Sequence, residues 1–384
     1  MDKVYEIRKF VAPEFVFGVG SRKFAGSYLN NLNINKVLLV TDKGLLKTPW
    51  VSKLCDNLKE HEINFEIFSD VTPNPRDFEV SEGAEFFSKT HCEGIVAIGG
   101  GSPMDCAKGI GIIASNGGTI HDYEGVDEIP KPIPPLVCIP TTSGTSADVS
   151  QFAIITNWDK RIKMAIVSRS VIPDVALIDP EITMTMPLDL TVNTGLDALT
   201  HAMEALVSNA AGPVTDLYAV KAITLVFEYL HKTVLNPEDL FLRDQMSLAS
   251  LYAGLAFSNA SLGAVHAMAH VLGGQLDLPH GECNAILLPY VIDYNFESAP
   301  SQYREAAKAI GIDCKNNEDI KDALLNAVFD LERKCGLDRR LSTLGVNTEM
   351  LKEFAHFALL DPCMVTNPVT PELSDIAGIY GKAL

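Results

Sequence analysis

The feature that most limits the fold of this chain is a change of periodicity near residue 180. Before it, short apolar runs such as 36–42, 65–68 and 94–98 alternate with amphipathic stretches. Such alternation is typical of βα units, which pack helices against a parallel sheet. From about residue 183, helical periodicity dominates instead. The sequence therefore predicts an α/β domain over residues 1–182 and an all-helical domain over residues 183–384.

Composition narrows the class of protein and its partners. The chain has 384 residues, of which 47% are hydrophobic, and its formal net charge is −18. A chain of this length exceeds one ordinary core, and its acidity disfavours nucleic acid and anionic membranes as partners. Its eight cysteines contain no C-x-x-C pair, and neither a signal-peptide pattern nor a long apolar run is present. We therefore expect a cytoplasmic protein with reduced thiols.

Two loops in the first half have the character of phosphate-binding loops. Gly99–Ser102 joins a predicted strand to a predicted helix, and Thr141–Thr145 follows another predicted strand. Glycines allow close approach of the backbone, and a helix N-terminus offers free N–H groups to a phosphate. Two such loops at the carboxyl ends of parallel strands form the usual ligand crevice of a doubly wound sheet. The glycine run does not match G-x-G-x-x-G, so a tight strand-to-helix turn is the alternative interpretation.

Asp42 stands at the end of the predicted strand 36–42. Its carboxylate could accept hydrogen bonds from a ribose diol and would repel a 2′-phosphate, which favours NAD over NADP. As a single residue it is equally compatible with a helix cap.

The second half carries a pattern of metal-binding residues. Asp197 and His201 lie four residues apart in an apolar run that reads as a helix, so both side chains project from one face. His266 and His270 repeat this spacing, and His280 follows in a Leu-Pro-His-Gly loop. A lone histidine in an apolar helix would be interpreted as a core residue. Several buried imidazoles are harder to explain in this way, because each has two ring nitrogens that need hydrogen-bond partners or a metal. Five candidates exceed a four-ligand site, so one is not a ligand. Imidazoles with a carboxylate suit Fe²⁺, Zn²⁺ or Ni²⁺.

These motifs together resemble the iron-containing (group III) alcohol dehydrogenases, in particular their 1,3-propanediol dehydrogenase and lactaldehyde reductase types. The resemblance runs from end to end and rests on residues 99–105, 141–145, 194–201, 266–280 and 361–368. It implies a Rossmann-like dinucleotide-binding domain, an all-α C-terminal domain, and a metal in the cleft between them. It also implies a homo-oligomer, either a dimer or a larger assembly.

Matched motif positions imply roles for individual residues. The metal would be bound by Asp197, His201, His266 and His280, while His270 would lie near the nicotinamide and take part in proton transfer. The residues that would contact the dinucleotide are Asp42, Gly99, Gly100, Gly101, Ser102, Asp105, Thr141, Thr142, Thr145 and Lys163. Three positions depart from the family's usual residues, Asp148, Asn193 and Glu282, and the last two affect the expected substrate preference.

We therefore expect a metal-dependent NAD(H) alcohol dehydrogenase and aldehyde reductase that acts on short primary alcohols or diols. Hydride would pass between the substrate carbon and C4 of the nicotinamide while the metal polarises the substrate oxygen. Fe²⁺ is the expected metal, with Zn²⁺ or Ni²⁺ as alternatives. Two other functions stay open, a zinc-dependent polyol dehydrogenase of the glycerol type and a non-catalytic sensor that binds NAD and metal.

Overall fold

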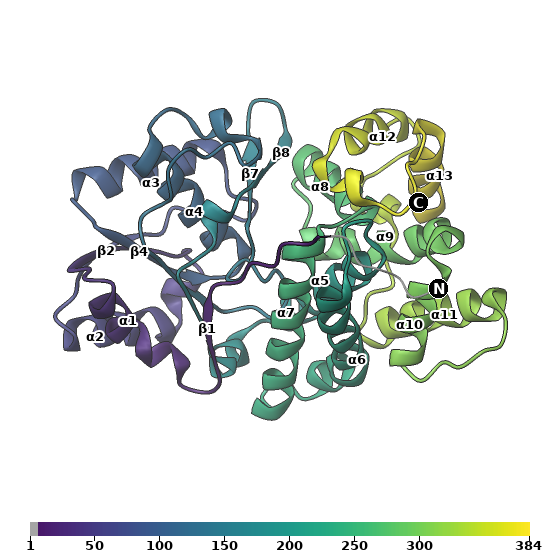
Figure 1. The fold of residues 1–384 in the computed structure, drawn as a ribbon, viewed down its shortest axis with the longest axis horizontal. Helices are drawn as coiled ribbons and strands as arrows, with labels where there is room; N and C mark the ends of the chain where they lie inside the picture. Colours follow the sequence, from purple (N-terminus) through teal and green to yellow (C-terminus); the bar gives the residue numbers. More distant parts are fainter. Residues whose placement is uncertain (1–6) are drawn as a thin grey trace. The chain divides into compact units, whose positions relative to one another are not determined.

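The computed structural model describes residues 7–384, which form two compact units (Figure 1). The α/β unit contains residues 12–190 and 237–247. The helical unit contains residues 191–236 and 248–384, together with the described residues up to Val11. The domain limits expected from the sequence, 1–182 and 183–384, stay a prediction.

The α/β unit is built on six parallel strands in the order β1-β9-β6-β4-β2-β3. In chain order they are β1 (Glu14–Phe17), β2 (Lys36–Val40), β3 (Asn64–Phe68), β4 (Gly94–Gly99), β6 (Leu136–Pro140) and β9 (Val175–Ile178). All residues of the inner strands β4 and β6 are buried. A strand covered on both faces needs apolar side chains at every position, which explains their continuous hydrophobic runs.

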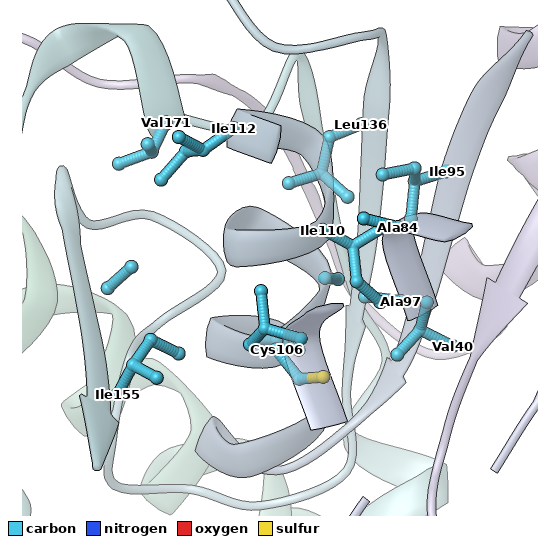
Figure 2. Close-up of a cluster of buried hydrophobic side chains, with 14 of the residues drawn as sticks. Val40, Ala84, Ile95, Ala97, Cys106, Ile110, Ile112, Leu136, Ile155 and Val171 are labelled. Atoms are coloured by element: carbon cyan, nitrogen blue, oxygen red, sulfur yellow. The ribbon is translucent and has the colours of Figure 1, made fainter. Parts of the chain in front are cut away.

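Helices cover both faces of this sheet, and strand side chains alternate between them. Leu38 and Ile95 join the core that packs with α3 (Asp77–Lys89) and α4 (Gly101–Asn116), as Figure 2 shows around Cys106 and Ile110. Leu39 and Val96 join the opposite core, which packs with α1 (Ala25–Asn31) and α2 (Pro49–Glu60). This two-sided packing fixes where each strand ends, and therefore where the loops that follow the strands lie.

A smaller sheet in the same unit was not indicated by the sequence pattern. It has the order β5-β8-β7 and consists of β5 (Gly125–Val126), β7 (Phe152–Asn157) and β8 (Ile162–Val167). Strands β7 and β8 form an antiparallel hairpin in which Lys163 lies opposite Thr156.

The helical unit contains most of the chain after residue 190, apart from residues 237–247. The helices are α5 (Leu188–Val207), α6 (Pro213–Leu235), α7 (Leu240–Ala260), α8 (Ala264–Leu276), α9 (His280–Asn295), α10 (Pro300–Ala309), α11 (Asn317–Lys334), α12 (Leu351–Leu360) and α13 (Leu373–Ala383). Helix α5 is buried along nearly its whole C-terminal two thirds, where apolar residues surround a polar stripe that contains Asp197, His201 and Glu204. Within residues 7–384, no single helix is long and apolar enough to cross a membrane; α7 and α8 pass that test only as a pair bent by 100°.

Candidate metal and dinucleotide sites

Three of the predicted metal ligands converge in the interior of the helical unit. Asp197 and His201 lie one turn apart on α5, and His266 lies in the first turn of α8. Their nearest ligand atoms all lie within 4.8 Å of one another. Nε2 of His201 lies 3.9 Å from Oδ1 of Asp197, and Nε2 of His266 lies 3.8 Å from the same oxygen. Oδ1 of Asp197 therefore lies within 4 Å of both imidazole nitrogens.

His280 completes the set from a third helix. The sequence predicts it in a loop, but it is the first residue of α9. Its Nε2 lies 3.9 Å from Oδ1 of Asp197, and a quarter of its side chain is exposed, whereas the other three residues are buried. Gly281 explains how α9 reaches this position, because a Cβ there would lie 2.4 Å from the carbonyl oxygen of Asn193 on α5. The glycine allows the backbones of the two helices to touch beside the predicted ligands.

A buried carboxylate, Glu204, supports His266 from behind. Its Oε2 lies 2.5 Å from Nδ1 of His266, and its Oε1 accepts a 2.6 Å hydrogen bond from the backbone N–H of Val265. Glu204 therefore does two things at once: it accepts a hydrogen bond from a backbone N–H that the start of α8 leaves without a helical partner, and it orients the imidazole of His266. Burial raises the pKa of Glu204 to about 7, against hydrogen bonds from Val265 and Gly263 and the charge of His201, which lower it. With the Nδ1 proton shared with Glu204, Nε2 of His266 keeps its lone pair for a cation.

His270 forms a separate pair with Asp361. Its Nδ1 lies 2.8 Å from Oδ2 of Asp361, whose Oδ1 accepts a 2.8 Å bond from the backbone N–H of Cys363. Burial by itself would raise the pKa of Asp361, but the charge of His270 and the hydrogen bonds from His270 and Cys363 hold it below its usual value. The imidazole ring stacks on that of His280 at 5.4 Å between centroids. His270 is thus held beside the ligand set.

His270, Asp361 and Cys363 also place three potential ligand atoms within 4.8 Å of one another. A thiol binds a metal as the thiolate. Burial and the charges of Asp361 and Glu204 raise the pKa of Cys363 well above its usual value. This group is therefore better suited to orienting an imidazole than to binding a cation.

The two predicted phosphate-binding loops lie against each other in the α/β unit. Strands β4 and β6 are neighbours, with Gly99 paired to Pro140, so their following loops start side by side. A Cβ on Gly100 would meet Thr142 at 3.2 Å, and one on Gly101 would meet Thr145 at 3.1 Å. The glycines thus let the backbone of one loop pack on the threonines of the other at the N-terminus of α4. A glycine-lined helix start of this kind can receive a pyrophosphate.

Other predicted dinucleotide residues lie in the same unit. Asp42 follows β2, the neighbour of β4, and its Oδ1 accepts hydrogen bonds from the N–H groups of Gly44 and Leu45. Asp42 therefore caps the turn that follows β2, as the alternative interpretation of this residue predicted. Asp105 lies one turn into α4, and Lys163 lies on β8 in the smaller sheet.

The positions that depart from the expected family pattern have defined environments. Glu282, in the first turn of α9, is buried, and its Oε1 accepts a 2.8 Å hydrogen bond from Nη1 of Arg339. Burial raises the pKa of Asp148 to about 6, against a backbone hydrogen bond and the charge of Lys108, which lower it. Asn193 contributes its backbone to the contact with Gly281.

Three functional candidates in the helical unit were missed by sequence reasoning: Glu204, Asn284 and Asp361. Glu204 lies seven residues after Asp197 and Asn284 lies four after His280, which are both helical same-face spacings. These spacings were available as a signal. Nothing local connects Asp361 with His270, which lies 91 residues away.

Comparison with known proteins shows the family to which the chain belongs. The family model described as iron-containing alcohol dehydrogenase matches residues 12–180, and the model of the C-terminal part of that family matches residues 191–384. The 1,3-propanediol dehydrogenase of Citrobacter freundii is 40% identical, covering 99% of both chains. The NAD-dependent methanol dehydrogenase of Bacillus methanolicus is 38% identical, covering 98% of this chain and 99% of the relative. A crystal structure of 1,3-propanediol oxidoreductase superposes with a TM-score of 0.96 at 39% identity, covering 99% of this chain and all of the other.

The chain therefore belongs to the iron-containing alcohol dehydrogenase family. The predicted family, the fold class and the enzyme class, an oxidoreductase acting on CH–OH groups, are confirmed. The zinc-dependent glycerol-type alternative is not favoured by these relatives.

Proposed function

We propose that this chain is an NAD(H)-dependent alcohol dehydrogenase and aldehyde reductase with a cation bound by Asp197, His201, His266 and His280. The observation that carries the proposal is the convergence of three imidazole Nε2 atoms on Oδ1 of Asp197, at 3.8 to 3.9 Å. Three nitrogens and one oxygen, without a thiolate, fit a borderline divalent ion. The family name supports Fe²⁺, while Zn²⁺ and Ni²⁺ suit the same donors. Such a cation supplies a Lewis acid for an alcohol or carbonyl oxygen.

The dinucleotide is proposed to lie on the glycine loop of the α/β unit. The close packing of Gly100 and Gly101 on Thr142 and Thr145 leaves backbone N–H groups at the start of α4 to receive phosphate oxygens. The negative charge of Asp42 favours NAD over NADP by repelling a 2′-phosphate. The NAD dependence of the methanol dehydrogenase relative agrees with this choice. The remaining contacts proposed are Gly99, Ser102, Asp105, Thr141 and Lys163.

His270 is proposed to carry the substrate proton. Its Nδ1 is engaged by Asp361 at 2.8 Å, so Nε2 is the nitrogen that can accept or give a proton. The buried carboxylate would also stabilise the imidazole when it is protonated. In this proposal Asp361 orients His270, and His270 transfers the proton.

Short primary alcohols and diols are the proposed substrates, because the relatives include 1,3-propanediol and methanol dehydrogenases. The protein is proposed to act in the cytoplasm as a homo-oligomer, with neither nucleic acid nor a membrane as a partner. The acidic net charge of −18 supports the last point.

The test is an anaerobic assay on protein stripped of metal and then reloaded with Fe²⁺, with Zn²⁺ or with no metal. NAD⁺ reduction is followed with ethanol, 1,3-propanediol and 1,2-propanediol. Activity that returns with Fe²⁺ supports the proposal, and the substrate ranking defines the alcohol class. Activity with Zn²⁺ alone would instead support the zinc-dependent polyol dehydrogenase. NAD binding without NAD⁺ reduction, whichever metal is loaded, would support the non-catalytic sensor.

A further inference from the structure

Asn367 is hydrogen-bonded at an end of each of the three helices that carry the proposed cation ligands. It follows a short 3-10 helix, Pro362–Thr366, and is only 2% exposed. Its carbonyl oxygen accepts a 2.7 Å bond from Nδ2 of Asn209, two residues after the end of α5. Its Oδ1 accepts a 3.1 Å bond from the N–H of Ala264, the first residue of α8, and a 2.9 Å bond from Nδ2 of Asn295, the last residue of α9. One buried residue therefore links the three helices.

The start of α8 depends on side chains from elsewhere in the chain. Gly263 precedes this helix and has no side chain that could cap it. The first N–H groups of a helix have no partner within the helix, and here they are buried. Glu204 accepts a bond from the N–H of Val265, which leaves the N–H of Ala264 for Asn367. A Cβ on Gly263 would lie 2.9 Å from Oδ1 of Asn367 and 3.1 Å from Oε1 of Glu204, so the glycine leaves room for both acceptors.

A reciprocal pair of amides connects Asn367 with Asn295. Nδ2 of each side chain donates to Oδ1 of the other at 2.9 Å, and Asn295 is also buried. The second N–H of Asn367 donates to the backbone oxygen of Val369 at 2.7 Å. The side chain thus uses both of its donors and both acceptor positions of its oxygen. Turning the amide by 180° would place a donor against the N–H of Ala264, so the contacts define its orientation.

The residues before Asn367 contact the same helix at two more places. The hydroxyl of Thr366 donates to the backbone oxygen of Leu262 at 2.6 Å, just before α8. Asp361 contacts His270, further along α8. Residues 361–367 therefore follow α8 from its start to His270, and Asn367 is held in place by contacts other than its own cap.

We propose that Asn367 is a positioning residue for the cation site, because it holds the first turn of α8 in place relative to α5 and α9. This inference rests on the cation site of the proposed function. His266 is the third residue of α8, and its Nε2 lies 3.8 Å from Oδ1 of Asp197. Metal–ligand distances vary by only about 0.2 Å, so a shift of this turn would move the imidazole out of place. Asn367 acts on His266 through the backbone.

The test compares wild-type protein with Asn367→Leu and Asn367→Asp. Leucine has the same branched shape as asparagine but neither donates nor accepts a hydrogen bond. Aspartate keeps an acceptor for the N–H of Ala264, and its charge suits a helix N-terminus. The control is Thr233→Val on α6, which removes an equally buried hydroxyl that donates to the backbone oxygen of Tyr229 at 2.9 Å.

Each protein is stripped of metal and titrated with Co²⁺, whose visible absorption reports the geometry of its ligands. The free energy of unfolding in urea is measured without metal on the same samples. A residue that only stabilises the fold changes the second quantity alone. A positioning residue also changes the Co²⁺ affinity and the spectrum of the bound ion.

Asn367→Leu should bind Co²⁺ at least about 10-fold more weakly, the lower limit for groups that support a metal ligand, with an altered spectrum. Asn367→Asp should regain most of the affinity because it caps α8. Thr233→Val should lose stability and keep the wild-type affinity and spectrum. The inference is overturned if Asn367→Leu loses only stability, as the control does. It is also overturned if Asn367→Asp binds no better than Asn367→Leu, since the cap would then not position His266.

Asn209→Ala keeps the test decisive if the leucine variant does not fold. Asn209 is exposed, and the substitution removes its bond to the backbone oxygen of Asn367 without disturbing the core. This variant should bind Co²⁺ more weakly than wild type. Wild-type affinity and spectrum in Asn209→Ala, with an unfolded Asn367→Leu, would overturn the inference.

Failure of this inference is distinct from failure of the proposed function. Wild-type protein that binds Co²⁺ and, when loaded with Fe²⁺, reduces NAD⁺ keeps the proposed function, whatever the Asn367 variants show. Wild-type protein that binds neither cation overturns the cation site and the positioning role of Asn367 together.

Discussion

Oε2 of Glu204 lies 2.5 Å from Nδ1 of His266, and neither side chain is more than 4% exposed. Glu204 follows Asp197 and His201 along one face of α5, and His266 lies in the first turn of α8. The pair therefore connects the two helices. Glu204 therefore fixes the orientation of a proposed cation ligand, since both of its carboxylate oxygens contact groups at the start of α8.

Glu204→Gln should weaken cation binding by about 10- to 100-fold, the usual cost of altering a group that supports a ligand. A glutamine amide can donate to Nδ1 of His266, which moves the imidazole proton to Nε2 and removes the lone pair that a cation needs. Cation affinity is measured by competition with a chelating dye, and circular dichroism monitors folding. Unaltered affinity in a folded variant would contradict the supporting role.

His270→Gln should lower kcat by about 100-fold or more, the lower range for a general acid or base, with cation content unchanged. Asp361→Asn should lower kcat in the same direction, because an amide can hold the wrong tautomer of His270. Metal analysis accompanies the kinetics. If cation content fell together with activity, His270 would be reassigned as a ligand.

Gly281→Ala should destabilise the protein by about 1–3 kcal/mol, the usual cost of overpacking. The new Cβ would lie 2.4 Å from the backbone oxygen of Asn193, so α9 must move away from α5 and carry His280 with it. Cation affinity should fall as well. Gly378→Ala on α13 is the matched control, since a Cβ there meets nothing within 4 Å, and it should stabilise by up to about 1 kcal/mol. Equal urea-unfolding free energies for the two variants would contradict the prediction.

Glu332 on α11 makes stability depend on pH. Burial raises its pKa from 4.5 to about 8, and its Oε1 has no hydrogen-bond partner among the described residues. Between these two pKa values the folded state binds more protons than the unfolded state, so stability falls as pH rises and levels off above pH 8. At about 1.4 kcal/mol per pKa unit, the loss is on the order of a few kcal/mol.

Glu332→Gln removes this charge, so the variant should gain stability relative to wild type between pH 6 and pH 9. The free energy of unfolding in urea is measured at both values. The exposed Asp322→Asn on the same helix is the control and should show no such gain. An equal difference between wild type and Glu332→Gln at pH 6 and pH 9 would contradict the prediction.

The sequence predicts the sheet strands well because both of their faces are buried. Runs such as residues 94–99 contain nothing but apolar residues and glycine, so strand and loop positions are readable locally. The hairpin of β7 and β8 is also buried nearly throughout, and it lacks the alternation that distinguishes a half-exposed strand.

The residues proposed to bind a cation are readable from their spacing in the sequence, but their surroundings are not. Pro279-His280-Gly281 has the composition of a turn, yet α9 starts there, and Gly281 meets the backbone of Asn193 on a helix far away in the sequence. Glu204 and Asn284 lie at helical spacings from the ligands, but only tertiary contacts show that their polar atoms point at them. Asp361 reaches His270 through chain folding alone.

All residues proposed to bind the cation, together with Glu204, Asn284 and Asp361, belong to the helical unit. Three of its helices must be in place before the donors converge. Loss of the cation and melting of this unit are thus coupled, and each tenfold excess of cation over its dissociation constant adds about 1.4 kcal/mol to folding stability. We therefore expect the ion to stay bound through many catalytic cycles, while the dinucleotide binds and dissociates in each cycle.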